Sequence, residues 1–215
     1  MPIPSKAGEG QAMIGVLLDA QRSGINRGTS GNASVREGEG FIITPSALAY
    51  ETMGPEDLVL VDALGVSSGE HRPSSEWLFH QRIYQERDDV DAIVHLHSPG
   101  ATALSTLRLG IPSFHYMVAV AGGIDIRCSD YATFGTDALA DTAVVALTDR
   151  RACLLANHGL IACGSSTRAA YNLAIEVESL ANQYLLARTA GHPTLLSEQE
   201  MHDVLDRFSD YRPDR

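Results

Sequence analysis

Two histidines, His95 and His97, lie two residues apart in the stretch DAIVHLHSPG at residues 91–100. If this stretch is an extended strand, its side chains alternate between faces, so both imidazoles project from one face while Val94 and Leu96 project from the other. A strand that buries Val94 and Leu96 would hold two neutral nitrogen donors at the edge of a pocket, where a divalent metal could bind both. A pair of surface or hydrogen-bonded histidines explains the same spacing, so the spacing alone does not decide between the two interpretations.

A third candidate donor is His158, in the turn that follows the apolar stretch ACLLA at residues 152–156. Metal sites that do chemistry commonly use three protein ligands and leave one position for water or substrate. We expect Gly159 to allow this turn unusual backbone angles. The other histidines are scattered over predicted loops and helices and are poorer candidates: His71, His80, His115, His192 and His202.

Two further polar segments have ordinary structural explanations. The stretch NRGTSGNASV at residues 26–35 could bring backbone N–H groups close to an anion, but its residue types are also those of a polar turn. Glu76 follows Ser74 and Ser75, either of which suits a helix N-cap, and a carboxylate in the first helical turn is favoured by the helix dipole. From these residues alone, the structural interpretation of both segments comes first.

Hydrophobic periodicity and turn residues predict the elements that position these side chains. We expect helices over about residues 5–23, from Ser74 or Ser75 through Tyr84, over 98–107, 136–147 and 167–188, and after Ser197, where SEQE resembles a capping box. We expect strands over 33–36, 41–44, 58–61, the His-x-His stretch, 118–123 and 152–156, and a short strand after His158.

Composition limits the partners and the compartment. A chain of 215 residues with 44% hydrophobic content suits one domain over residues 1–215. The net charge of −11 argues against nucleic acid or an anionic membrane surface as partner, and no apolar run is long enough to span a bilayer. The odd set of cysteines favours reduced thiols, and the N-terminus lacks a secretory pattern, so we expect a cytoplasmic protein.

Seven motifs, in order along nearly the whole chain, carry a resemblance to a known family. They are TSGNASVR (29–36), ITPS (43–46), PSSEW (73–77), VHLH (94–97), FHYM (114–117), YATFGT (131–136) and NHGLIAC (157–163). Together they resemble the class II aldolase/adducin family. The resemblance implies an α/β fold: a single domain with a central, mainly antiparallel β-sheet flanked by helices in three layers.

The resemblance also implies a site. It makes His95, His97 and His158 the ligands of one Zn²⁺ per subunit, with Glu76 beside the metal as ligand and catalytic acid/base. Tyr116 would act on the aldehyde oxygen across a subunit boundary of a homotetramer, and Tyr211 resembles a second tyrosine in the family's tail. Phe134 would shape the aldehyde end of the pocket. The phosphate would be bound by backbone groups and short polar side chains of Thr29, Gly31, Asn32, Ser46, Ser74 and Ser75.

The implied reaction is zinc-dependent, reversible cleavage of a small phosphorylated sugar. The expected substrate is a deoxyketose 1-phosphate such as L-fuculose 1-phosphate, and the products are dihydroxyacetone phosphate and an aldehyde such as lactaldehyde. Alternatives are an aldolase for a 5-deoxy- or methylthio-ribulose 1-phosphate, a pentulose-5-phosphate 4-epimerase, and a non-enzymatic adducin-like interaction module. One departure bears on the substrate: Ala47 stands where relatives often have glycine, which puts a methyl group in the expected phosphate loop.

Overall fold

A seven-stranded sheet forms the centre of the molecule. The computed structural model describes residues 7–210, and its strands follow the order β4-β3-β2-β1-β5-β7-β6, with every neighbouring pair antiparallel. The strands are β1 (Asn32–Glu37), β2 (Gly40–Ile43), β3 (Val59–Val61), β4 (Ser67–Ser68), β5 (Ala92–Leu96), β6 (Ala152–Leu155) and β7 (Gly159–Gly164). The predicted antiparallel sheet is confirmed.

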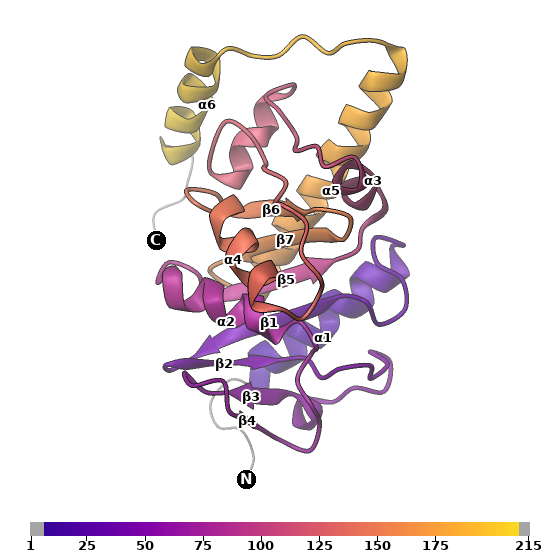
Figure 1. Ribbon diagram of the computed structural model, residues 1–215, viewed down its shortest axis with the longest axis vertical. Coiled ribbons are helices and arrows are strands. Elements are labelled where there is room, and N and C mark those ends of the chain that lie inside the picture. Colours follow the sequence, from indigo (N-terminus) through magenta and orange to yellow (C-terminus); the bar gives the residue numbers. More distant parts are fainter. Residues whose placement is uncertain (1–6, 211–215) are drawn as a thin grey trace.

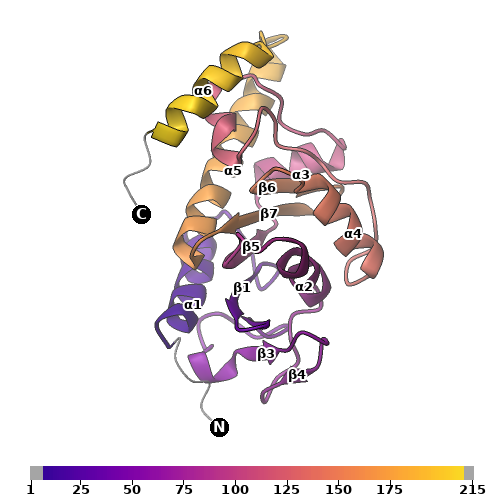
Figure 2. The same cartoon turned by 90° about the vertical axis from the view of Figure 1, so that its left-hand side faces the viewer.

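Helices cover both faces of this sheet (Figure 1). They are α1 (Ala7–Arg22), α2 (Trp77–Glu86), α3 (Pro99–Thr106), α4 (Asp137–Ala146), α5 (Thr167–Ala190) and α6 (Glu198–Asp210), with short 3-10 helices η1 (Pro55–Asp57) and η2 (Tyr116–Ala121). Figure 2 shows the sheet between α1 and α5 on one side and α2 and α4 on the other. This arrangement confirms the three-layer prediction.

The alternation of side chains along β5 explains why the sheet has an apolar core on both faces. Val94 and Leu96 pack in the core beneath α1 and α5, and Ile93 packs in the core beneath α2 and α4. His95 shares the face of Ile93 and is fully buried. The expectation that Val94 and Leu96 are buried is confirmed, because both are 0% exposed.

The prediction of a strand at residues 118–123 is wrong, because this apolar stretch lies mostly in the 3-10 helix η2. His115 caps the helix: its Nδ1 accepts a hydrogen bond from the backbone N–H of Met117 at 3.1 Å. Gly122 ends it with a φ of 94°. An apolar run this short does not distinguish strand from helix by its pattern, so local capping decides.

Several smaller predictions can be checked against the described residues. Ser197 and Glu200 form the expected capping box, in which the backbone N–H of Ser197 donates to the Glu200 carboxylate at 2.7 Å and the Glu200 N–H donates to Ser197 Oγ at 3.3 Å. The three cysteines are free. Within residues 7–210, no helix combines the length and apolar character needed to cross a membrane.

Candidate active site

Three imidazoles and one carboxylate converge beyond the end of β5. The donor atoms of Glu76, His95, His97 and His158 all lie within 4.8 Å of one another. Nε2 of His95 is 2.9 Å from Nε2 of His97 and 3.2 Å from a Glu76 oxygen, and Nε2 of His158 is 2.9 Å from the other Glu76 oxygen. The His-x-His pair therefore does share one face, as the strand pattern predicted.

His95 has a fixed ring orientation. Its Nδ1 lies 2.8 Å from the backbone carbonyl oxygen of Leu160 on the adjacent strand β7. A carbonyl only accepts, so Nδ1 carries a hydrogen and Nε2 is the ring nitrogen that faces the cluster. Burial lowers the pKa of the neighbouring His97 to about 3, with His95 and His158 adding to the effect. His97 is thus a neutral nitrogen donor at physiological pH, and His95 presents its Nε2 to the same cluster.

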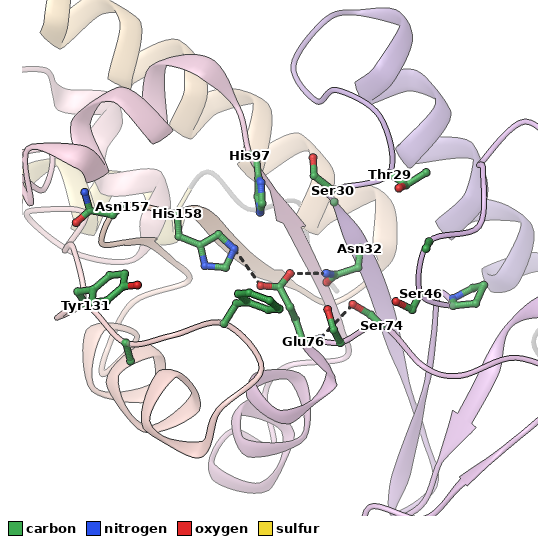
Figure 3. A pocket seen from close by; sticks show the side chains of 16 residues that line it. Thr29, Ser30, Asn32, Ser46, Ser74, Glu76, His97, Tyr131, Asn157 and His158 are labelled. Carbon is green, nitrogen blue, oxygen red and sulfur yellow. Dashed lines mark hydrogen bonds and ion pairs between the residues drawn. The ribbon is translucent and has the colours of Figure 1, made fainter.

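Glu76 occupies the N-cap position of α2, with φ −105° and ψ 13°, and makes no side-chain cap hydrogen bond. The expectation that it serves the first helical turn, behind a serine N-cap, is wrong: the side chain leaves the helix and points at the histidines (Figure 3). Burial raises its pKa, but His95 and His158 outweigh this effect and hold the pKa well below its usual range. Oε2 accepts a hydrogen bond from Asn32 Nδ2 at 3.0 Å.

The loop that carries His158 is held by close packing rather than by an unusual φ at Gly159. The residue with left-handed backbone is Asn157, at φ 57°, and Gly159 has no positive φ. A Cβ at Gly159 would lie 2.4 Å from the Leu96 carbonyl oxygen, so only glycine allows β7 to approach β5 this closely. The expected unusual backbone angles at Gly159 are therefore not found, and glycine is needed there because of its close contact with β5.

Three residues of this cluster, Glu76, His97 and His158, line a pocket of about 440 Å³ and lie between Tyr131 on one side and Thr29 and Ser46 on the other (Figure 3). Every residue predicted to bind substrate lines this pocket: Thr29, Gly31, Asn32, Ser46, Ser74, Ser75 and Phe134. The described lining residues include no lysine or arginine, so hydroxyls, amides and backbone N–H groups are the available anion donors. Such neutral donors, close to the N-terminus of α2, suit a phosphate group.

The two predicted tyrosines lie away from this pocket or outside the described residues. Tyr116 is half exposed in η2, where its ring lies 6.5 Å from that of Phe208 on α6, and it is absent from the pocket lining. Tyr211 falls outside residues 7–210. Within one chain, Tyr116 therefore does not line the pocket that holds Glu76.

Sequence reasoning overlooked three polar residues of the pocket. They are Ser30, Tyr131 and Asn157, which Figure 3 shows around its rim. Each belongs to one of the motifs that carry the family resemblance, and that membership was the only available signal. Ala47 also lines the pocket and has a left-handed φ of 59°, the conformation that a glycine would adopt more easily.

The donor set fits a divalent metal. In tetrahedral zinc with bonds of about 2.0 Å, neighbouring ligand atoms are roughly 3.3 Å apart. Three of the nitrogen and oxygen contacts, at 2.9–3.2 Å, are close to this distance, and the remaining donor pairs lie within 4.8 Å. Among the described residues, the buried Oε1 of Glu76 has His158 Nε2 at 2.9 Å but no hydrogen bond of good geometry, and a cation between these two atoms would satisfy both.

Comparison with known proteins gives a consistent result. Residues 11–185 match the family profile described as Class II Aldolase and Adducin N-terminal domain. The chain is 50% identical over 199 residues to a 5-methylthioribulose-1-phosphate/5-deoxyribulose-1-phosphate aldolase of Rhodospirillum rubrum, covering 91% of this chain and 90% of that protein. It is 44% identical over 200 residues to the L-fuculose phosphate aldolase of Escherichia coli, covering 93% of both.

The fold comparison agrees with the sequence comparison. A solved structure named L-fuculose 1-phosphate aldolase superposes with a TM-score of 0.92 at 40% identity, covering 95% of this chain and 98% of the other. The proteins named here are all aldolases, which confirms the prediction of an aldehyde-lyase and speaks against a non-enzymatic module. The chain belongs to the class II aldolase and adducin family.

Proposed function

We propose that the protein is a zinc-dependent aldolase that reversibly cleaves a ketose 1-phosphate into dihydroxyacetone phosphate and an aldehyde. The observation that carries the proposal is a cluster of one carboxylate and three imidazoles in the wall of a pocket whose other lining residues offer neutral anion donors. Relatives named for ketose-phosphate cleavage support the substrate class.

His95, His97 and His158 would hold the metal, with Glu76 beside them. A bound divalent cation supplies a Lewis acid that stabilises the negative charge left when a carbon–carbon bond next to a carbonyl breaks. Neutral imidazole ligands leave most of the cation's charge available for this purpose.

Glu76 is the acid/base in this proposal. Its carboxylate is ionised, one oxygen accepts a hydrogen bond from Asn32, and the other lies 2.9 Å from Nε2 of His158 in the metal-ligand cluster. In synthesis the carboxylate takes a proton from carbon, and the new hydroxyl group gains one. Cleavage is the reverse: the hydroxyl of the departing aldehyde loses a proton as the carbon–carbon bond breaks, and the Glu76 carboxyl group returns one to carbon and is left ionised.

Thr29, Gly31, Ser46, Ser74 and Ser75 would hold the phosphate, with one N–H of the Asn32 amide still available beside them. Phe134 and the neighbouring Tyr131 are more than half exposed at the pocket and would contact the aldehyde portion. Ala47 lies in the phosphate loop in a conformation that keeps the glycine-like path of the backbone.

Tyr116 would complete the aldehyde end of a neighbouring subunit's pocket in a homotetramer, because its half-exposed ring lies outside the pocket of its own chain. Tyr211, which follows α6 in sequence, would join it. Mixing a Glu76→Gln chain with a Tyr116→Phe chain tests this arrangement. Hybrid assemblies should regain activity, whereas two inactive variants that never complement each other would place Tyr116 outside the site.

Three candidate substrates are favoured by specific relatives. The relative at 50% identity is named for methylthioribulose and deoxyribulose 1-phosphates, and the relative at 44% is named for fuculose phosphate. A coupled assay for dihydroxyacetone phosphate release, run on a panel of these ketose 1-phosphates, tests the proposal. Release from at least one is expected; no release from any, with epimerisation of a pentulose 5-phosphate instead, would overturn it.

A further inference from the structure

A buried chain of hydrogen bonds, which we term the Glu76 relay, connects the interior of the protein to the active-site carboxylate. It runs from Tyr84 Oη to Ser34 Oγ (2.8 Å), from Ser34 Oγ to His80 Nδ1 (2.7 Å), from His80 Nε2 to Asn32 Oδ1 (2.6 Å), and from Asn32 Nδ2 to Glu76 Oε2 (3.0 Å). All five side chains are buried, and His80 and Ser34 are 0% exposed.

The carboxylate at one end determines the direction of every hydrogen bond in the relay. An ionised carboxylate only accepts, so Asn32 must present its Nδ2 to Glu76 and its Oδ1 to His80. His80 Nε2 must then carry a hydrogen, which leaves Nδ1 of the neutral ring to accept from Ser34. The Tyr84 hydroxyl donates to Ser34, so each group has one defined role.

The His80 ring is held rigidly in the neutral form. Phe79 and Phe41 both stack on it, with their ring centroids 4.5 Å and 6.4 Å from the centroid of the imidazole. Complete burial lowers the pKa of His80 to about 3, with His95 adding to the effect. The imidazole is therefore a fixed hydrogen-bond donor rather than a source of protons.

The surroundings of the relay are apolar. Phe41, Phe79, Ile83 and Ile93 belong to the core between the sheet and α2. An apolar side chain at position 80 would pack there without the cost of burying polar groups, which is considerable when their hydrogen bonds are incomplete. Packing alone therefore gives no reason for a histidine at this position.

We propose that His80 is a positioning residue for the aldol reaction: its Nε2–H fixes the Asn32 amide so that Asn32 holds one oxygen of Glu76 and leaves the other for proton transfer. The proposal rests on the proposed acid/base function of Glu76. Without the His80 donor, the Asn32 amide loses the hydrogen bond that anchors its Oδ1, so its Nδ2 can shift away from Glu76 and the hydrogen bond to Oε2 weakens. Loss of such outer partners of a metal site commonly costs about 10–100-fold in activity.

Two substitutions separate positioning from packing. His80→Met has a similar size and no donor, and we expect kcat to fall about 10–100-fold while KM and metal content stay unchanged, because the phosphate end and the histidine ligands are untouched. In His80→Gln the side-chain amide can replace the Nε2–H donor, and kcat should return to within about threefold of the original. His192→Met, at an exposed loop position, is the matched control and should leave kcat unchanged.

A direct measurement on the unaltered protein keeps the proposal testable even if His80→Met fails to fold. Nitrogen-15 NMR of histidine-labelled protein, assigned by the signal lost in His80→Gln, should show a protonated Nε2 and an unprotonated Nδ1. A protonated Nδ1, a wild-type kcat in His80→Met, or equal losses in the Met and Gln variants would each overturn the proposal. A fully active Glu76→Gln variant would instead overturn the proposed role of Glu76, whereas an inactive Glu76→Gln with an active His80→Met would refute the role of His80 alone.

Discussion

Replacing Gly159 by alanine should separate β5 and β7 next to His97 and His158, two candidate ligands of the metal site. An added Cβ would lie 2.4 Å from the carbonyl oxygen of Leu96 and 3.1 Å from Cδ2 of His97. Carbon–oxygen contacts normally begin at roughly 3.3 Å, so the strands must move apart by about 0.9 Å. Because this shift lies next to both His97 and His158, and a misplacement of about 1 Å can cost about 100-fold in rate, we expect kcat to fall on the order of 100-fold.

The assay is steady-state release of dihydroxyacetone phosphate, with metal content and urea unfolding measured on the same preparations. Gly15→Ala is the matched control, because a Cβ there meets nothing within 4 Å and the residue lies inside helix α1. The control should keep its activity and gain about 1 kcal/mol of stability from helix propensity. A Gly159→Ala enzyme with kcat within a few fold of the original would refute the argument that this close approach positions the histidines.

Three further predictions address the phosphate loop, the support of α3 and the ligand set. Ala47→Gly should raise the free energy of unfolding by about 0.5–1 kcal/mol, because a left-handed alanine costs about 1–2 kcal/mol and glycine loses about 0.5–1 kcal/mol through backbone entropy. A lower free energy of unfolding, measured by urea denaturation, would contradict this. Glu178→Gln should lose about 2–3 kcal/mol of unfolding free energy in the same assay. The two oxygens of the buried carboxylate accept hydrogen bonds from the backbone N–H groups of Gly100 and Ala101 at the start of α3, and the NH₂ group of an amide cannot accept one of them. An unchanged unfolding midpoint would show that these hydrogen bonds do not stabilise the fold. His97→Ala should bind less metal per chain by elemental analysis after dialysis, since it loses one of the three imidazole donors, whereas full stoichiometry would remove it from the ligand set.

Local sequence patterns predicted most of the architecture. The alternation of Val94 and Leu96 with His95 identified a strand and the face on which the histidines lie, and the structure confirms both. The apolar run at residues 118–123 was misassigned, because a run this short fits either strand or helix until its caps are known.

Glu76 shows where local reasoning and chemistry differ. Its sequence position suits a carboxylate at a helix start, and only the family resemblance gave it a catalytic role. The structure supplies the physical reason: a non-helical backbone at the N-cap turns the side chain away from α2 and toward His95 and His158.

Contacts between distant residues account for what the sequence did not predict. His80 was a scattered helical histidine, yet its partners Ser34 and Asn32 lie 46 and 48 residues away. The requirement for glycine at position 159 likewise arises from the Leu96 carbonyl on the neighbouring strand. Neither contact, that of His80 with Ser34 and Asn32 or that of Gly159 with Leu96, leaves a local sequence pattern from which it could be predicted.

The most direct test of the proposed metal-dependent chemistry is reconstitution of aldol cleavage with Zn²⁺ after removal of metal by a chelator. The proposed site predicts that activity disappears and returns with about one equivalent of Zn²⁺ per chain, while Glu76→Gln binds the same equivalent without regaining turnover. Cleavage that is unaffected by chelation, or a fully active Glu76→Gln enzyme, would contradict it.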